Sequence, residues 1–195
     1  QKMLSFSELG VGENVLKAIQ ELGFIEPTPI QQQAIPVLLA DETDFVGLAQ
    51  TGTGKTAAFG LPILELTDLR IPTTQALILA PTRELCVQIA NDLAKYGKFH
   101  RAANITAVYG GANIIQQIRQ IKKGSQIVVA TPGRLLDVIN RGAIDMGEIR
   151  YLILDEADEM LNMGFKDDID EILSHLPEKR RVWLFSATMP QEVRS

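Results

Sequence analysis

A glycine-rich segment near residue 50 has the residue types that cradle a polyphosphate. It lies between a short apolar run and a helical pattern, and it consists of Gln50, Thr51, Gly52, Thr53, Gly54, Lys55 and Thr56. Glycines allow backbone N–H groups to turn inward on phosphate oxygens, and the start of the following helix adds a favourable dipole. We expect Lys55 to reach the β- and γ-phosphates and the Thr56 hydroxyl to ligate Mg²⁺. The strict pattern has glycine where this chain has Ala49, and the alternative is a glycine-rich turn with an exposed lysine.

A group of carboxylates follows another apolar run much later in the chain. Residues 151–154 are followed directly by Asp155, Glu156 and, after one alanine, Asp158. Carboxylates placed after a buried strand are desolvated unless a cation or hydrogen-bond donors meet them. We expect Asp155 to hold Mg²⁺, largely through water, and Glu156 to orient or deprotonate an attacking water. The alternative is an acidic first turn of a helix, where the helix dipole favours negative charge.

The runs that precede these residues belong to a series of short apolar segments alternating with helical patterns. The six runs cover residues 45–49, 76–80, 105–109, 126–130, 151–154 and 182–185. They lack strict alternation of apolar and polar residues, which suits strands buried on both faces. Between them, segments such as 83–98 and 114–121 repeat apolar residues every three or four positions. This order predicts an α/β fold with a mostly parallel twisted sheet and helices on both faces, whose ligands bind at the carboxyl ends of the strands.

Two further helices are expected before the first strand. One apolar face is formed by Val15, Leu16, Ile19 and Leu22. Gly23 ends this helix, and the second runs over residues 28–39 with a kink at Pro36. We therefore expect one domain, with a helical appendage at residues 1–40 and a core at residues 41–195.

The composition restricts the class of protein. The 195 residues carry 19 Lys+Arg and 24 Asp+Glu, a net charge of −5, so any binding of nucleic acid has to be local rather than by bulk positive charge. The single cysteine, Cys86, excludes an intramolecular disulfide and a cysteine-rich zinc site. No apolar run approaches the ~20 residues of a membrane span, so we expect a cytoplasmic protein without membrane contact. The basic residues 179–181, before the last strand, are expected to form a solvated turn.

The motifs together resemble the DEAD-box RNA helicases, a family named after the tetrapeptide at residues 155–158. The similarity covers nearly the whole chain in the order of the family's motifs. Besides the segments above, it includes Phe6, Gly23-Phe24, Pro27-Thr28-Pro29-Ile30-Gln31, Pro81-Thr82-Arg83-Glu84-Leu85, Gly110-Gly111, Thr131-Pro132-Gly133-Arg134 and Ser186-Ala187-Thr188. Ala49, unusual in a general phosphate loop, is what this family usually has. The resemblance implies a RecA-like phosphate-loop domain that uses ATP and Mg²⁺.

The segment at residues 27–31 is similar to the family's Q motif. The resemblance implies that Gln31 reads the adenine base, that Phe24 stacks on it, and that Thr28 belongs to the same nucleotide-binding element. The residues alone favour another interpretation, because Thr28 and Gln31 have the spacing of a helix capping box with Pro29 at the first helical position. The two are compatible, since a capped turn fixes the glutamine amide for adenine recognition.

Three loops that follow strands are candidates for binding RNA. Their residues are Pro81, Thr82 and Arg83, then Gly110 and Gly111, and finally Thr131, Pro132, Gly133 and Arg134. Hydroxyls, arginines and loop N–H groups suit backbone phosphates rather than bases, although any one loop alone is explained by helix caps and turns. The resemblance implies that together they hold single-stranded RNA by its sugar–phosphate chain. We expect that binding to be independent of base sequence and sensitive to salt.

The end of the last strand is expected to contact the carboxylate group. Ser186 and Thr188 carry hydroxyls that we expect to bond Asp158, and the resemblance associates this motif with coupling of ATP use to RNA unwinding. Ordinary local hydrogen bonds at a strand end are the alternative.

The resemblance also implies a second, C-terminal RecA-like domain of the same polypeptide, which carries arginine fingers and is not among these residues. We therefore expect the chain to be monomeric, to bind ATP·Mg²⁺ weakly, to hydrolyse it slowly and not to unwind RNA. The full-length parent is expected to be an RNA-dependent ATPase that separates short duplexes. The alternatives are an ATP-dependent RNA clamp and a DNA-directed helicase.

Overall fold

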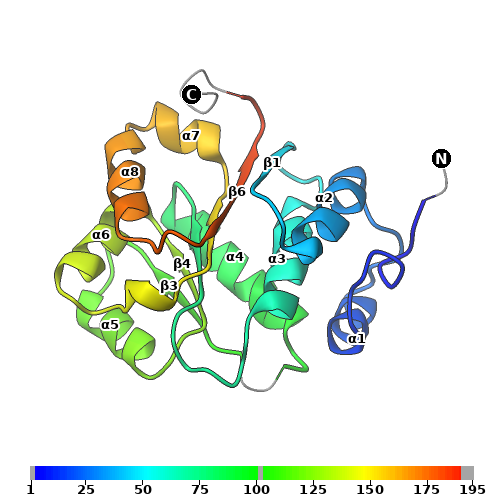
Figure 1. Ribbon diagram of the computed structural model, residues 1–195, viewed down its shortest axis with the longest axis horizontal. Helices are drawn as coiled ribbons and strands as arrows, with labels where there is room; N and C mark the ends of the chain where they lie inside the picture. Colours follow the sequence, from blue (N-terminus) through cyan, green and yellow to red (C-terminus); the bar gives the residue numbers. More distant parts are fainter. Residues whose placement is uncertain (1–2, 101–102, 190–195) are drawn as a thin grey trace.

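Six strands form one sheet in the computed structural model, which describes residues 3–100 and 103–189 (Figure 1). The strands are β1 (Phe45–Leu48), β2 (Ala76–Leu79), β3 (Ile105–Val108), β4 (Ile127–Ala130), β5 (Tyr151–Leu154) and β6 (Arg181–Ser186). Their order across the sheet is β1-β6-β5-β2-β4-β3, and every pairing between described strands is parallel. The predicted parallel sheet is confirmed, and each strand lies within a few residues of its predicted run.

Helices cover both faces of the sheet. They are α1 (Glu13–Glu21), α2 (Pro29–Ala40), α3 (Lys55–Leu66), α4 (Arg83–Tyr96), α5 (Ile114–Lys122), α6 (Pro132–Asn140), α7 (Ala157–Asn162) and α8 (Lys166–Ser174), with a 3₁₀ turn, η1, at Met146–Glu148. Figure 1 shows α1–α4 on one side of the sheet and α5–α8 on the other. The central strands supply residues alternately to the two faces: Ile78 packs in the cluster beneath α3 and α4, whereas Leu77 and Leu79 pack on the opposite face. The strands β2, β4 and β5 are buried along their whole length, which explains their lack of strict polar alternation. The expectation of burial on both faces was wrong for the edge strand β1, in which Val46 and Leu48 are exposed, and β3 at the other edge alternates half-buried and buried residues.

The two N-terminal helices share the first of these clusters with the sheet. Val15 and Ile19 of α1 and Ile35 of α2 are fully buried in it. The helix α2 continues through Pro36 to Ala40. The prediction that Leu22 belongs to the apolar face of α1 was wrong: α1 ends at Glu21, and Leu22 lies beyond the packed turn with 43% of its surface exposed.

The strand order divides one edge of the sheet into two halves. The loops after β1, β5 and β6, which are neighbours, carry the phosphate loop, the carboxylates and Ser186. The loops after β2, β3 and β4, also neighbours, carry the three candidate RNA-binding segments. Among the described residues, no helix is both long enough and apolar enough to cross a membrane.

Candidate functional site

The phosphate loop connects β1 to α3 through two glycines with left-handed backbones. Gly52 has φ of +87° and Gly54, the N-cap of α3, has φ of +83°. A side chain at Gly54 would also collide with the amide nitrogen of Gln31. Thr53 closes the loop by donating its hydroxyl hydrogen bond to the carbonyl of Gln50. Only glycine satisfies both the backbone conformation and the close approach at position 54.

Lys55, the first residue of α3, joins the phosphate loop to the carboxylates. Its Nζ lies 3.1 Å from Asp155 Oδ1 and 3.1 Å from Glu156 Oε2. The side chain is only 6% exposed, so the alternative of a turn with an exposed lysine is wrong. A second link is the Thr51 hydroxyl, which donates a 2.9 Å hydrogen bond to Glu156 Oε1. The two motifs are therefore one site.

Glu156 is held in an uncommon backbone conformation at the start of α7. Its φ is 55°, in the left-handed region that residues other than glycine rarely adopt. The residue is the N-cap of α7 but makes no side-chain cap bond, since its carboxylate instead meets Lys55 and Thr51. Backbone strain of this kind costs on the order of 1–3 kcal/mol and is typical of functional sites.

Asp155 has the surroundings of a cation ligand. It is completely buried, and this burial raises the pKa of its carboxyl to about 6, even though Lys55 acts to lower it. Oδ1 contacts Lys55, whereas Oδ2 is buried and has no partner among the described residues. The described residues hold no cluster of three His, Cys, Asp or Glu that would bind a metal alone. A site with one carboxylate fits Mg²⁺, which usually takes its other oxygens from phosphates and water. Thr56, beside the same cavity, would supply a hydroxyl.

A cavity of about 230 Å³ lies next to these groups. The phosphate loop, Asp155 and Glu156 form one wall, and Phe24 and Gln31 form another. The third wall is one face of α4, formed by Leu85, Gln88, Asp92 and Tyr96. Burial raises the pKa of both Asp92 and Tyr96. Sequence reasoning missed this face, although its spacing of three or four residues marks one stripe of a helix.

The predicted capping box is present at the start of α2. Thr28 N–H donates to Gln31 Oε1 at 2.9 Å, and Gln31 N–H donates to Thr28 Oγ1 at 3.5 Å. The same amide reaches the phosphate loop, because Gln31 Nε2 donates to the Gly54 carbonyl at 3.0 Å. Gln31 is 2% exposed. Phe24 is partly buried and lies edge-on to Tyr96, with ring centroids 5.8 Å apart.

The loops after β2 and β3 meet through an arginine and a tyrosine. Thr82 caps α4 by accepting a 3.2 Å bond from Leu85 N–H, and Pro81 before it is buried. Arg83 is exposed, and its guanidinium lies over the Tyr109 ring at 5.0 Å. Gly110 and Gly111, which follow Tyr109, are also exposed, so this part of the sheet edge presents one guanidinium beside an open glycine turn.

Arg134 connects the third loop to the second. It is partly buried, and its Nη1 donates to the Ala112 carbonyl at 3.0 Å and to Gln117 Oε1 at 3.1 Å. The Gln117 amide in turn bonds both backbone groups of Tyr109, at 3.3 and 3.2 Å. Among its loop neighbours, Thr131 makes no side-chain cap bond to α6, Pro132 is buried and Gly133 is exposed. Arg134 therefore shapes the Gly110–Gly111 turn, together with Gln117, which the sequence analysis did not select.

Asp158 is bonded to the end of β6. Its Oδ2 accepts from Thr188 N–H at 3.2 Å and from the Thr188 hydroxyl at 3.1 Å, and its own N–H donates to Ser186 Oγ at 3.1 Å. Partial burial acts to raise the pKa of the Asp158 carboxyl, but the hydrogen bonds from Thr188 and Ser186 outweigh it and the net pKa is lowered. The expected contact between the carboxylate segment and the strand end is present.

With this geometry established, comparison with known sequences assigns the family. Residues 28–195 match the family model described as DEAD/DEAH box helicase. The chain belongs to the DEAD/DEAH box helicase family.

Curated relatives in this family are similar over almost the entire chain. It is 50% identical to the "DEAD-box ATP-dependent RNA helicase CshA" of Geobacillus kaustophilus over 98% of the chain, which is 41% of that protein. It is 52% identical to the "ATP-dependent RNA helicase CshA" of Listeria monocytogenes, again over 98% of the chain and 36% of the relative. The chain thus spans about two fifths of the length of these relatives.

A solved structure of the family has the same fold. A DEAD box protein from the hyperthermophile Methanococcus jannaschii superposes with a TM-score of 0.94 at 46% identity, over 99% of this chain and 52% of that one. The prediction of a RecA-like α/β domain is confirmed for this member of the DEAD/DEAH box family.

Proposed function

We propose that this chain is the N-terminal, ATP-binding domain of an ATP-dependent RNA helicase, with residues 1–40 as its Q-motif appendage and 41–195 as its core. The observation that carries the proposal is the position of Lys55, whose Nζ lies 3.1 Å from the carboxylates of both Asp155 and Glu156, the two residues that follow β5. A buried lysine at the start of a helix, facing carboxylates across a glycine loop, suits a polyphosphate with a divalent cation.

In this proposal, Lys55 exchanges a carboxylate for phosphate oxygens when ATP binds. Release of Glu156 Oε2 by Lys55 leaves that oxygen free to accept a proton from the attacking water, while the Thr51 hydroxyl keeps Oε1 in place. Asp155 and Thr56 hold Mg²⁺, which when bound neutralises charge on the β- and γ-phosphates. Gln31 and Phe24 contact the adenine, and the remaining phosphate-loop residues, Gln50 to Gly54, surround the phosphates.

The other half of the sheet edge is proposed to hold RNA. Arg83 and the exposed turn at Gly110 and Gly111 contact backbone phosphates, together with the loop of Thr131 to Arg134. Phosphate contacts carry no base information, so binding is independent of sequence and falls with salt. The hydrogen bonds between Asp158 and Thr188 then connect the carboxylate segment of the proposed ATP site to the end of β6.

The isolated chain is proposed to be weakly active. Its cavity of about 230 Å³ is smaller than the roughly 300–1,000 Å³ of ordinary small-molecule sites, so these residues enclose only part of a nucleotide. A second RecA-like domain would close the site and add the arginine fingers, which are worth ~10³–10⁵ in rate. We further propose that the fragment is monomeric and that the parent acts in the cytoplasm, where RNA and ATP occur together.

Titration calorimetry of ATP with Mg²⁺ against the 195-residue chain tests the proposal. We expect weak but saturable binding that is lost in Lys55→Ala and retained in Lys95→Ala, a substitution of an exposed lysine on α4. Absence of saturable binding, or unchanged binding in Lys55→Ala, would contradict it.

A further inference from the structure

A second cavity, of about 520 Å³, lies at the opposite edge of the sheet, where β5 and β6 begin. Its lining includes four basic residues, Arg150, Lys179, Arg180 and Arg181, and two acidic residues, Asp41 and Glu178. We call it the basic cavity. It is larger than the cavity beside Lys55. The expectation of a solvated turn at residues 179–181 holds for Lys179, which is exposed, but was wrong for Arg180, which is partly buried, and for Arg181, which begins β6.

On one side of the basic cavity, two guanidiniums share a single carboxylate. Arg181 Nε lies 3.6 Å from Asp41 Oδ1, and Arg150 Nη2 lies 3.7 Å from Asp41 Oδ2. These distances exceed the ~2.7–2.9 Å of a charge-assisted hydrogen bond. Asp41 Oδ2 also accepts from the Tyr151 hydroxyl at 3.0 Å. Arg181 Nη2 also donates to the Asp41 backbone carbonyl at 3.0 Å. One carboxylate carries a single negative charge against two guanidiniums, so Asp41 leaves them incompletely neutralised.

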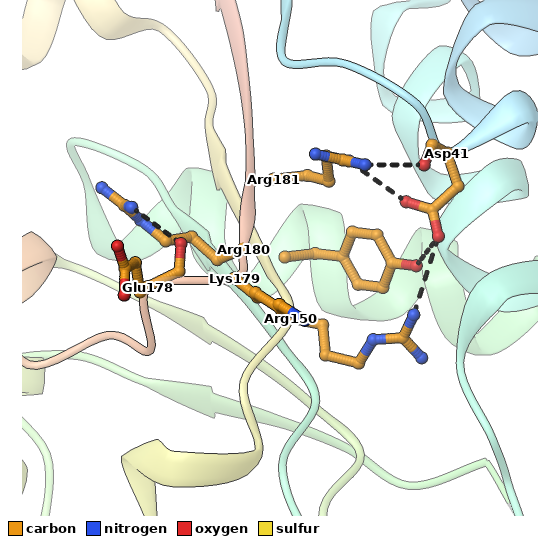
Figure 2. Close-up of a pocket in the computed structure, with 7 residues that line it drawn as sticks. Asp41, Arg150, Glu178, Lys179, Arg180 and Arg181 are labelled. Carbon is orange, nitrogen blue, oxygen red and sulfur yellow. Dashed lines mark hydrogen bonds and ion pairs between the residues drawn. The ribbon is translucent and has the colours of Figure 1, made fainter.

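On the other side, Arg180 and Lys179 have no carboxylate partner among the described residues. Figure 2 shows Arg150 and Arg181 directed at Asp41, whereas Arg180 turns toward Glu178. The contact made by Arg180 is with the Glu178 backbone carbonyl, at 3.3 Å, and its Nε is buried without a partner among the described residues. A buried cationic donor without a partner is costly unless a ligand satisfies it.

We propose that the basic cavity binds a phosphate-bearing anion. A guanidinium group can donate two parallel hydrogen bonds to one phosphate. The chain as a whole has a net charge of −5, so the excess of positive charge is confined to this cavity and its surroundings. An acidic peptide is a poorer fit, since the lining residues other than Tyr151 are charged and offer no apolar anchor. The anion is either a small polyphosphate or a segment of RNA backbone, which present the same chemical group.

This site is separate from the proposed ATP site. The strand β5 begins at Tyr151 in the basic cavity and ends just before Asp155, and β6 begins at Arg181 and ends at Ser186. The two sites therefore lie at opposite ends of the same strands, so binding at each can be measured separately.

Residue-resolved NMR of the 195-residue chain tests the proposal, with inorganic tripolyphosphate as the probe. We expect saturable shifts of the side-chain N–H signals of Arg150, Arg180 and Arg181, in addition to any shifts at the phosphate loop. A second titration with a single-stranded oligouridylate distinguishes the sources. Shifts of these three arginines with both probes indicate RNA backbone, and shifts with tripolyphosphate alone indicate a small anion. No shift of these arginines with either probe overturns the proposal.

Variants locate the binding. Lys179→Ala with Arg180→Ala should weaken the tripolyphosphate response of Arg150 and Arg181 about tenfold, because the ligand loses its unpaired cations. The matched control, Lys122→Ala with Lys123→Ala, removes two exposed lysines at the end of α5 and should leave it unchanged. Glu178→Gln removes repulsion and should tighten binding, which keeps the test decisive if the double variant is unstable. Equal weakening by the α5 pair, or no change in either cavity variant, contradicts the proposal.

Discussion

The side-chain nitrogen of Gln31 donates a 3.0 Å hydrogen bond to the carbonyl of Gly54, so the start of α2 is tied directly to the phosphate loop. Gln31 Oε1 is at the same time bound to the N–H of Thr28 within the capping box. One buried amide thus fixes both a helix N-terminus and the residue before Lys55. The helical segment before the first strand therefore helps to position the phosphate loop.

Gly54→Ala should lower the free energy of unfolding by more than the strain of a left-handed alanine accounts for. The backbone at Gly54 is left-handed, and a methyl group there would also meet the Gln31 amide. Gly164→Ala is the matched control, since Gly164 has a similar φ of +87° but open space around it. We expect the control to lose about 1–2 kcal/mol from the left-handed conformation, and Gly54→Ala to lose more and to abolish ATP binding. Equal free energies of unfolding for both variants would show that the contact with Gln31 is unimportant.

Gln31→Ala should reduce the preference for ATP over GTP and destabilise the fold. The variant loses the reciprocal half of the capping box and the bond to Gly54, for a combined loss of roughly 1–2 kcal/mol. Gln33→Ala, an exposed glutamine on the same helix, serves as control. Competition binding of the two nucleotides measures the preference. If Gln31→Ala discriminates as well as the unmodified chain does, the adenine role is wrong and the amide is structural only.

ATP·Mg²⁺ binding should strengthen as the pH rises through about 6. The carboxyl of Asp155 has a pKa raised to about 6 by burial, so it is protonated and neutral below that pH and ionised above it. Only the ionised form attracts a cation. Calorimetric titrations between pH 5 and pH 8 measure the trend, and Asp155→Asn separates it from the titration of ATP itself. An identical pH dependence in both proteins would exclude Asp155 as the source.

One arginine and one glutamine substitution should distinguish a residue that contacts RNA from a residue that positions a loop. Arg83→Ala should weaken RNA binding and reduce the slope of log affinity against log salt by about one, because a phosphate contact is lost. Gln117→Ala should weaken binding severalfold with an unchanged slope, since Gln117 is buried and bonds Tyr109 rather than RNA. Gln116→Ala, on the exposed face of α5, should change neither. Fluorescence anisotropy at several salt concentrations measures both quantities.

Loss of the Thr188 hydroxyl should uncouple ATP use from unwinding in the longer protein. Thr188→Ala removes the 3.1 Å bond to Asp158 but touches neither Lys55 nor Glu156. We expect near-normal RNA-stimulated ATPase activity and a lower yield of unwound duplex per ATP. Thr188→Ser, which keeps the hydroxyl, should restore the yield. A proportional fall in both activities would indicate a purely structural role.

The meeting of the phosphate loop with the carboxylates was predictable from local patterns. Lys55 and Asp155 are far apart in sequence, but each follows an apolar run, and the carboxyl ends of parallel strands meet at one edge. The capping box of Thr28 and Gln31 was equally readable. The bond from Gln31 to Gly54 was not, because it depends on how α2 packs beside α3.

Contacts among three or more elements escaped the sequence analysis for the same reason. In the sequence, Gln117 is one of several polar residues on a helix. Its positioning role is visible only in the structure, where its amide forms hydrogen bonds with both Tyr109 and Arg134. The basic cavity depends on β6 lying beside β5 and on the end of α2 reaching both, an order that no local pattern specifies. Spacing therefore predicted which residues lie together at the carboxyl ends of the strands better than it predicted which residues position them.

In the proposed function, Glu156 acts on the water that attacks ATP in an RNA-dependent enzyme. The most direct test is steady-state ATP hydrolysis by the longer protein containing this chain, with and without single-stranded RNA, for the unmodified protein, Glu156→Gln and the exposed control Glu159→Gln. We expect RNA-stimulated turnover that falls at least ~10²-fold in Glu156→Gln, with ATP binding retained, and that is unaffected in Glu159→Gln. Turnover that ignores RNA, or that survives in Glu156→Gln, would contradict the proposed function.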